Sequence, residues 1–146
     1  MVESSKKVKP WREDVRAAVL AAIARAEVMT DVADGKPHRG LRAGIRFFPM
    51  PLDQPLRVRM IFTLPKPSSA PKRKRTWPMR TPDLSKLIRS TEDAITTAGF
   101  WADDARVVEC TAAKRYPGEG EDALDSPGCV IYVEVLHEME GWRAAA

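Results

Sequence analysis

One segment, from Arg80 to Val108, restricts the fold of this 146-residue chain more than any other. It opens with Pro82 and Asp83, a turn-favouring proline followed by a carboxylate of the kind that caps a helix. Apolar residues then recur at helical spacing until Gly99, which is typical of a helix C-terminus. This stripe consists of Leu84, Leu87, Ile88, Thr91, Ile95 and Ala98. The segment therefore predicts one helix with defined ends, fixed against a sheet by its apolar face.

Carboxylates stand at both ends of this predicted helix. Asp83 precedes it, and Asp103 with Asp104 occupies the turn that follows it. We expect the helix to bring them toward a common point. Adjacent carboxylates repel and raise at least one pKa unless they share a cation, and oxygen ligands completed by water suit Mg²⁺. The alternative is that Asp83 is only a cap and that Asp103 and Asp104 form only a solvated turn.

The order of residues in this segment is specific. It reads Pro82-Asp83-Leu84, Leu87, a basic residue at Arg89, Asp93-Ala94-Ile95, and then Ala98 through Val108. This order resembles the signature of RusA-type Holliday junction resolvases, continues through Lys114 and Pro117, and covers residues 11 to 136 more loosely. The resemblance implies that Asp83, Asp103 and Asp104 bind Mg²⁺. It also implies that Arg89, which stands at the family's functional lysine, stabilises charge on the phosphate.

The activity implied by the resemblance is that of a Mg²⁺-dependent, structure-specific endodeoxyribonuclease. Such an enzyme resolves four-way junction DNA by paired symmetric nicks during DNA recombination and repair. The resemblance also implies a homodimer. This agrees with the two-fold symmetry of a four-way junction, because paired nicks need two sites related by a dyad.

The chain departs from the family pattern in two places. Ser85 replaces a second aspartate, and Lys86 follows where asparagine is usual. Glu92 lies seven residues from Ser85, a helical rise of about 10.5 Å, so we expect water rather than Glu92 in the vacant position. Arg89 keeps the positive charge of the family lysine but cannot donate a proton at neutral pH. Family members usually begin with a strand before their first helix, so we expect a short N-terminus here.

These departures keep two other functions open. One is a catalytically impaired protein that binds junctions or other DNA without cleaving them. The other is a basic protein-interaction or RNA-binding domain without a preference for junctions.

Charge is distributed unevenly, with 18 basic and 7 acidic residues in 1–82 but 6 and 13 in 83–146. Five prolines exclude a helix or an interior strand in the stretch Pro65 to Pro82. We expect an exposed basic arm there that contacts phosphate and offers an aromatic face to an unpaired base. The alternatives are a merely solvated charge run and a tryptophan folded back onto the body. The candidate nucleic-acid-binding residues are Lys72, Arg73, Lys74, Arg75, Trp77 and Arg80.

The predicted fold is one α+β domain over residues 1–146, with two main helices on a mixed sheet of about four strands. We expect the first helix at residues 11–29 and strands at Ile45–Phe48, Leu56–Leu64, Ala105–Ala113 and Cys129–Leu136. No apolar run is long enough to span a bilayer, so no membrane association is expected. Cys110 and Cys129 are interpreted as buried, reduced thiols, typical of a cytoplasmic protein in a bacterium or a phage-infected cell.

Overall fold

The computed structural model describes residues 10–21 and 50–136. The described chain contains two helices and a three-stranded sheet, which confirms the predicted α+β class. The predicted number of about four strands is wrong for this sheet, and the segment Ile45–Phe48 lies outside the described residues. The elements are a helix over residues 10–21, β1 (Leu56–Thr63), α2 (Leu84–Thr97), the short 3-10 helix η1 (Asp104–Arg106), β2 (Val107–Arg115) and β3 (Gly128–Val135).

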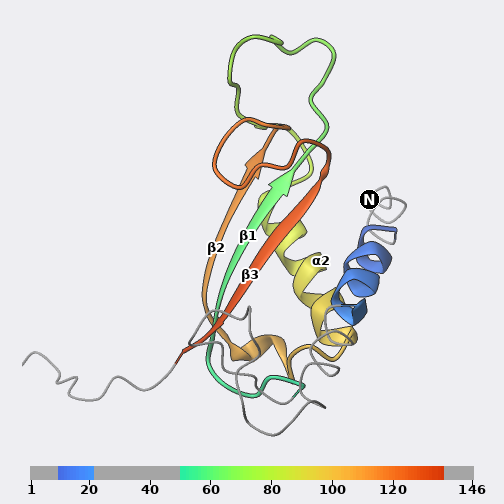
Figure 1. Ribbon diagram of the computed structural model, residues 1–146, viewed down its shortest axis with the longest axis vertical. Helices are drawn as coiled ribbons and strands as arrows, with labels where there is room; N and C mark the ends of the chain where they lie inside the picture. Colours follow the sequence, from blue (N-terminus) through green and yellow to red (C-terminus); the bar gives the residue numbers. More distant parts are fainter. Residues whose placement is uncertain (1–9, 22–49, 137–146) are drawn as a thin grey trace, which may run out of the picture. The chain divides into compact units, whose positions relative to one another are not determined.

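The sheet is mixed, as predicted, with β1 in its centre. β1 pairs in parallel with β2 and antiparallel with β3, so the strand order is β2-β1-β3 (Figure 1). In the first half of β1 buried residues alternate with more exposed ones, as expected of a strand that presents one face to the core. In the second half Met60, Ile61, Phe62 and Thr63 are all buried, so this half is covered on both faces. The alternation seen in the sequence thus marks the strand that carries the buried face of the sheet.

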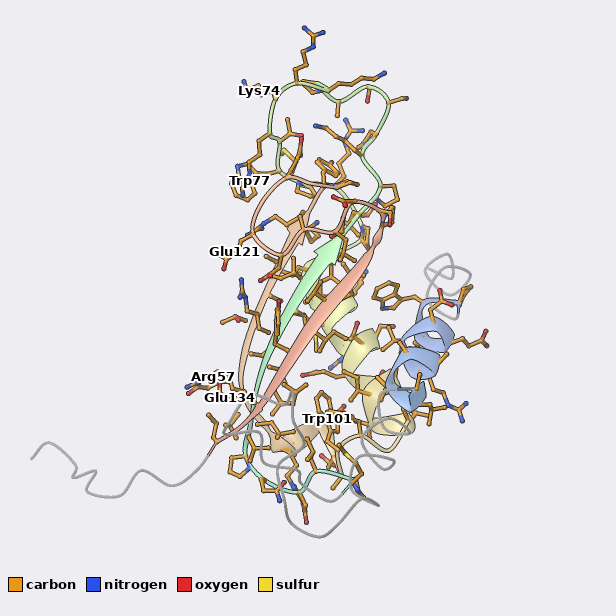
Figure 2. All side chains as sticks on the ribbon, in the orientation of Figure 1. Arg57, Lys74, Trp77, Trp101, Glu121 and Glu134 are labelled. Atoms are coloured by element: carbon orange, nitrogen blue, oxygen red, sulfur yellow. The ribbon has the colours of Figure 1, made fainter. Side chains whose placement is uncertain are left out.

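Arg57 links all three strands on the opposite face of the sheet. Its Nε donates to Oε2 of Glu109 on β2 at 2.5 Å, and its NH1 donates to Oε2 of Glu134 on β3 at 2.9 Å. Figure 2 shows Arg57 and Glu134 together at one end of the sheet. Because these side chains are about half exposed, each pair contributes modestly to stability.

The described residues form two compact units. One contains residues 10–21, 50–53 and 89–104, and the other contains residues 54–88 and 105–136. The helix α2 contributes residues to both units. In the first unit Val15, Leu52 and Trp101 are buried with the apolar residues of α2, while Trp11 donates through Nε1 to Oγ1 of Thr91 at 3.2 Å.

Gly99 ends α2 in the way the sequence predicts. Its φ is +78°, in the left-handed region that glycine adopts without strain. The amide of Gly99 donates to the carbonyl of Thr96 at 3.0 Å, and the amide of Phe100 donates to the carbonyl of Ile95 at 3.3 Å. This pair of bonds is the Schellman arrangement, which satisfies the last helical carbonyls. The reversal aims the following residues at the turn that carries Asp104.

The sequence also led to predictions about the burial of the two cysteines and about membrane-spanning segments. Neither cysteine forms a disulfide, but Cys110 is exposed, so the prediction of a buried thiol is wrong there because this part of β2 is exposed on both faces. Cys129 is partly buried, and burial raises the pKa of its thiol to about 12. In the ranges 10–21 and 50–136, no helix is long and apolar enough to cross a membrane.

Candidate active site and nucleic-acid interface

Asp104 is held by the last turn of α2. Its Oδ1 accepts hydrogen bonds from the hydroxyl of Thr96 and from the indole Nε1 of Trp101, the latter at 3.3 Å. The same indole nitrogen donates to Oγ1 of Thr96 at 2.6 Å, and the Trp101 side chain is buried. A buried ring and a helical hydroxyl therefore fix the Asp104 carboxylate through one of its oxygens.

Glu92 lies within electrostatic range of Asp104. Burial raises the pKa of Glu92, the charges of Asp104 and Asp93 raise it further, and the charge of Arg89 lowers it. The charges of Arg89 and Asp104 therefore both act on Glu92 in this unit. Adjacent carboxylates with a raised pKa are stabilised when they share a cation.

Glu92 was not predicted as part of the site. In the sequence Glu92 was considered only for its distance from Ser85 along the helix, whereas in the structure the charge of Asp104 acts on it. The sequence feature that indicates a place for Glu92 in the site is its spacing from Thr96. The two residues are four apart and therefore lie on one face of α2. Because Thr96 binds Asp104, the same face brings Glu92 toward that carboxylate.

Asp83 stands at the start of α2 in the other unit. Its carbonyl accepts the first helical hydrogen bond from the amide of Leu87 at 3.1 Å, so Asp83 occupies the predicted cap position. Its carboxylate pairs with Nζ of Lys86 at 3.3 Å, and both side chains are at least half exposed. The lysine that departs from the family pattern therefore contacts the predicted metal ligand directly.

Lys114, near the end of β2, fixes the loop that leads to Asp83. Its Nζ donates to the carbonyls of Arg80 at 2.8 Å and Pro82 at 3.0 Å. Both contacts are charge-assisted hydrogen bonds, which are stronger than neutral ones. In the sequence Lys114 is marked only by the family resemblance, and this positioning role was not predicted.

The predicted metal ligands belong to both units of the chain. Asp83 lies in one, while Asp103, which is exposed, and Asp104 lie in the other. A site shared by these three carboxylates stays a prediction. Of the residues that the structure describes, no group of three or more His, Cys, Asp or Glu is placed to hold one ion. Mg²⁺ usually takes only one or two carboxylates, with water and phosphate completing its shell, so Asp104 beside Glu92 fits its chemistry.

Residues 65–82 form a long loop without helix or strand, beyond the end of β1 (Figure 1). The basic residues from Lys72 to Arg75 are exposed, and Figure 2 shows Lys74 at the tip of the loop. Trp77 is 61% exposed, and the guanidinium groups of Arg75 and Arg115 lie 4.6 Å and 5.3 Å from its ring centroid. Trp77 is thus presented on the surface with cationic neighbours, which suits stacking on a base.

A comparison with protein families gives one match. A family model described as endodeoxyribonuclease RusA matches residues 45–122, more than half of the chain. No curated protein and no solved structure matches the chain at a significant level. The matched range contains the basic arm together with Asp83, Arg89 and Asp104.

Proposed function

Because the chain belongs to the endodeoxyribonuclease RusA family, we propose that it is a Mg²⁺-dependent nuclease that resolves four-way DNA junctions by paired symmetric nicks. The observation that carries this proposal is the family match, which encloses both the acidic residues around α2 and the basic arm. DNA recombination and repair in the cytoplasm of a bacterium or a phage-infected cell is the setting that this activity implies.

The proposed metal ligands are Asp83, Asp103 and Asp104. When bound, a Mg²⁺ ion neutralises charge on the scissile phosphate and lowers the pKa of the attacking water. The protein's part is to hold the ligands in place. Thr96 and Trp101 fix Asp104, and Lys114 fixes the loop before Asp83. Burial and, after it, the charge of Asp104 raise the pKa of Glu92. The effect of Asp104 supports a cation there, because a shared cation relieves the repulsion between two carboxylates.

Arg89 is the proposed partner of the phosphate oxygens. Its charge already acts on Glu92, and its side chain is exposed on α2, so it is available to an approaching phosphate. A guanidinium offers forked donors that match phosphate geometry and stays charged at every physiological pH. Its proposed role is therefore to stabilise negative charge as the phosphate reacts rather than to transfer a proton.

The basic arm is the proposed contact for the rest of the junction. Lys72, Arg73 and Lys74 are exposed cations suited to backbone phosphates, and Trp77 offers a face for an unpaired base. The proposed homodimer supplies two such surfaces, as the two-fold symmetry of a junction requires.

The test is cleavage of a synthetic four-way junction in a Mg²⁺ titration. Wild type is expected to give paired nicks, and Asp104→Asn is expected to lose cleavage while it keeps junction affinity within a few fold. Asp83→Asn should behave in the same way, and the double variant should be no worse than either single one if both residues serve one ion. Full cleavage by Asp104→Asn would remove this residue from the metal site.

A second function, a DNA-binding protein with impaired catalysis, is favoured by one contact. Lys86 places an ammonium group against the Asp83 carboxylate, where the family has an asparagine and a second aspartate nearby. The double variant Ser85→Asp with Lys86→Asn restores that pattern. Cleavage by this variant but not by wild type would show that wild type is a binder, whereas cleavage by wild type at millimolar Mg²⁺ would exclude the second function.

A further inference from the structure

Glu119 binds the basic arm at two positions, Lys66 near its start and Thr76 past its basic cluster. It lies in the loop between β2 and β3, where its Oε1 accepts a hydrogen bond from Nζ of Lys66 and its Oε2 accepts one from the amide of Thr76 at 3.4 Å. Lys66 also donates to the carbonyl of Lys74 at 3.2 Å. These bonds join residue 66 to residues 74–76, so the stretch between them is closed into a loop.

The ion pair at this closure is largely shielded from water. The side chains of Lys66 and Glu119 are 18% and 15% exposed, and the ammonium group also lies 5.8 Å from the ring centroid of Tyr116. Shielded charge pairs are less screened by salt than exposed ones. The closure is therefore expected to persist at the ionic strengths at which DNA binding is measured.

The neighbouring Gly120 allows the loop to approach the arm closely. Its φ is +131°, and a Cβ there would lie 2.9 Å from Nε of Arg115 and 2.9 Å from NH2 of Arg75. These are the two guanidinium groups that flank Trp77. One loop, through Glu119 and Gly120, thus contacts Lys66 and Thr76 of the arm and lies close to the cations beside its aromatic side chain.

The charge of Glu119 is unfavourable for binding a polyanion if only long-range electrostatics is considered. It lies among the basic groups of the arm, where Lys66, the amide of Thr76 and the charge of Arg75 lower the pKa of its carboxyl group and keep it ionised. An ionised carboxylate beside a phosphate-binding surface weakens binding unless it also organises that surface.

We infer that Glu119 is a positioning residue for nucleic-acid binding: it holds the arm closed so that Lys72, Arg73, Lys74 and Trp77 form a preorganised surface. This inference rests on the proposed binding of DNA by the arm. A closed arm does not have to lose loop freedom on binding, and preorganisation of this kind raises affinity without adding a contact. Removal of this negative charge is therefore expected to weaken binding of DNA, contrary to simple electrostatics.

The experiment compares Glu119→Ala with Glu121→Ala. Glu121 lies in the same loop, its side chain is 80% exposed, and its carboxylate is 3.4 Å from Arg59, so its removal changes the net charge equally without opening the arm. Figure 2 shows Glu121 at the surface.

Junction affinity is measured by fluorescence anisotropy, in Ca²⁺ or EDTA to prevent cleavage. Glu119→Ala should bind about fivefold more weakly than wild type, and Glu121→Ala should bind equally or slightly more tightly. Glu119→Gln, which keeps an acceptor oxygen, should fall between Glu119→Ala and wild type.

A readout without DNA separates this inference from the proposed function. Trypsin cleaves after lysine and arginine, so cleavage between Lys72 and Arg75 is expected to be faster in Glu119→Ala than in Glu121→Ala or wild type. Equal cleavage rates would overturn the closure. Faster cleavage with unchanged or tighter DNA binding would overturn the positioning role. If wild type binds no DNA at all while Glu119→Ala is cleaved faster, the proposed function and with it the positioning role fail, but the closure stands.

Discussion

Thr96→Val is expected to destabilise the fold by about 2 kcal/mol. The Thr96 hydroxyl donates to Asp104 and accepts the indole N–H of Trp101 at 2.6 Å, and valine has the same shape without the hydroxyl. A hydrogen bond to a charged group contributes about 1.5–3 kcal/mol, and an unsatisfied buried donor loses about 1–3 kcal/mol. The expected loss is less than the sum, because Trp101, with a side chain 1% exposed, keeps its 3.3 Å contact to Asp104.

The loss is measured by urea denaturation followed by tryptophan fluorescence, without divalent ions. For a domain of this size, about 2 kcal/mol corresponds to a fall in melting temperature of about 4–8 °C. Thr97→Val is the matched control, since the Thr97 hydroxyl donates only to the carbonyl of Asp93 on the exposed side of the same helix. It should change stability by less than about 0.5 kcal/mol, and Thr96→Ser should recover most of the loss. The reasoning is refuted if Thr96→Val is no more destabilising than Thr97→Val.

Two further predictions concern the arm and Glu92. Changing Lys72, Arg73 and Lys74 to alanine should reduce the salt dependence of junction binding. At about 0.9 per phosphate contact, the slope of log affinity against log salt concentration should fall by up to about 2.7. Between 50 and 200 mM salt, wild type should therefore lose up to about 40-fold more affinity than the variant. An unchanged slope would mean that these side chains do not contact phosphate. Because burial and Asp104 raise the pKa of Glu92, its contribution to stability is present at acid pH and is lost as the pH rises through its folded pKa. Glu92→Gln should therefore be more stable than wild type at pH 7 without metal. In thermal denaturation the difference in stability should vanish below about pH 4. Stability curves of the two proteins that run parallel with pH would contradict this.

The local elements of the fold were predictable because their signals are short in sequence. The alternation of apolar and polar residues in β1 and the glycine that ends α2 each act within a few residues, and both elements lie close to their predicted bounds. The family resemblance carried by Asp83 to Val108 is confirmed by the family match. The order of strands was not predictable in this way, because a central strand with one parallel and one antiparallel partner depends on pairing between distant residues.

The supports of the candidate site were missed for the same physical reason. Lys114 lies 32 residues from Pro82, and Glu119 lies 53 residues from Lys66, so neither contact leaves a pattern in a local window. The electrostatic effect of Asp104 on Glu92 was not predictable from their separation along the chain, because it depends on the reversal of the chain at Gly99. The candidate site residues can be predicted from the family resemblance. The side chains that hold these residues in place can be identified only from the fold.

The central place of β1 has a consequence for synthesis of the chain. Arg57 in β1 binds partners on β2 and β3 that lie 52 and 77 residues downstream. At a rate of synthesis of about 5–20 residues per second, these partners are made roughly 3 to 15 seconds after β1, which stays unpaired until then. Unpaired apolar strands invite association with other chains, which flanking charges and prolines oppose. The stretch that emerges directly after β1 is the basic, proline-rich arm. We therefore expect the residues proposed to hold DNA in the finished protein to protect the nascent strand as well, so that neutralising them lowers the yield of soluble protein as well as the affinity for DNA.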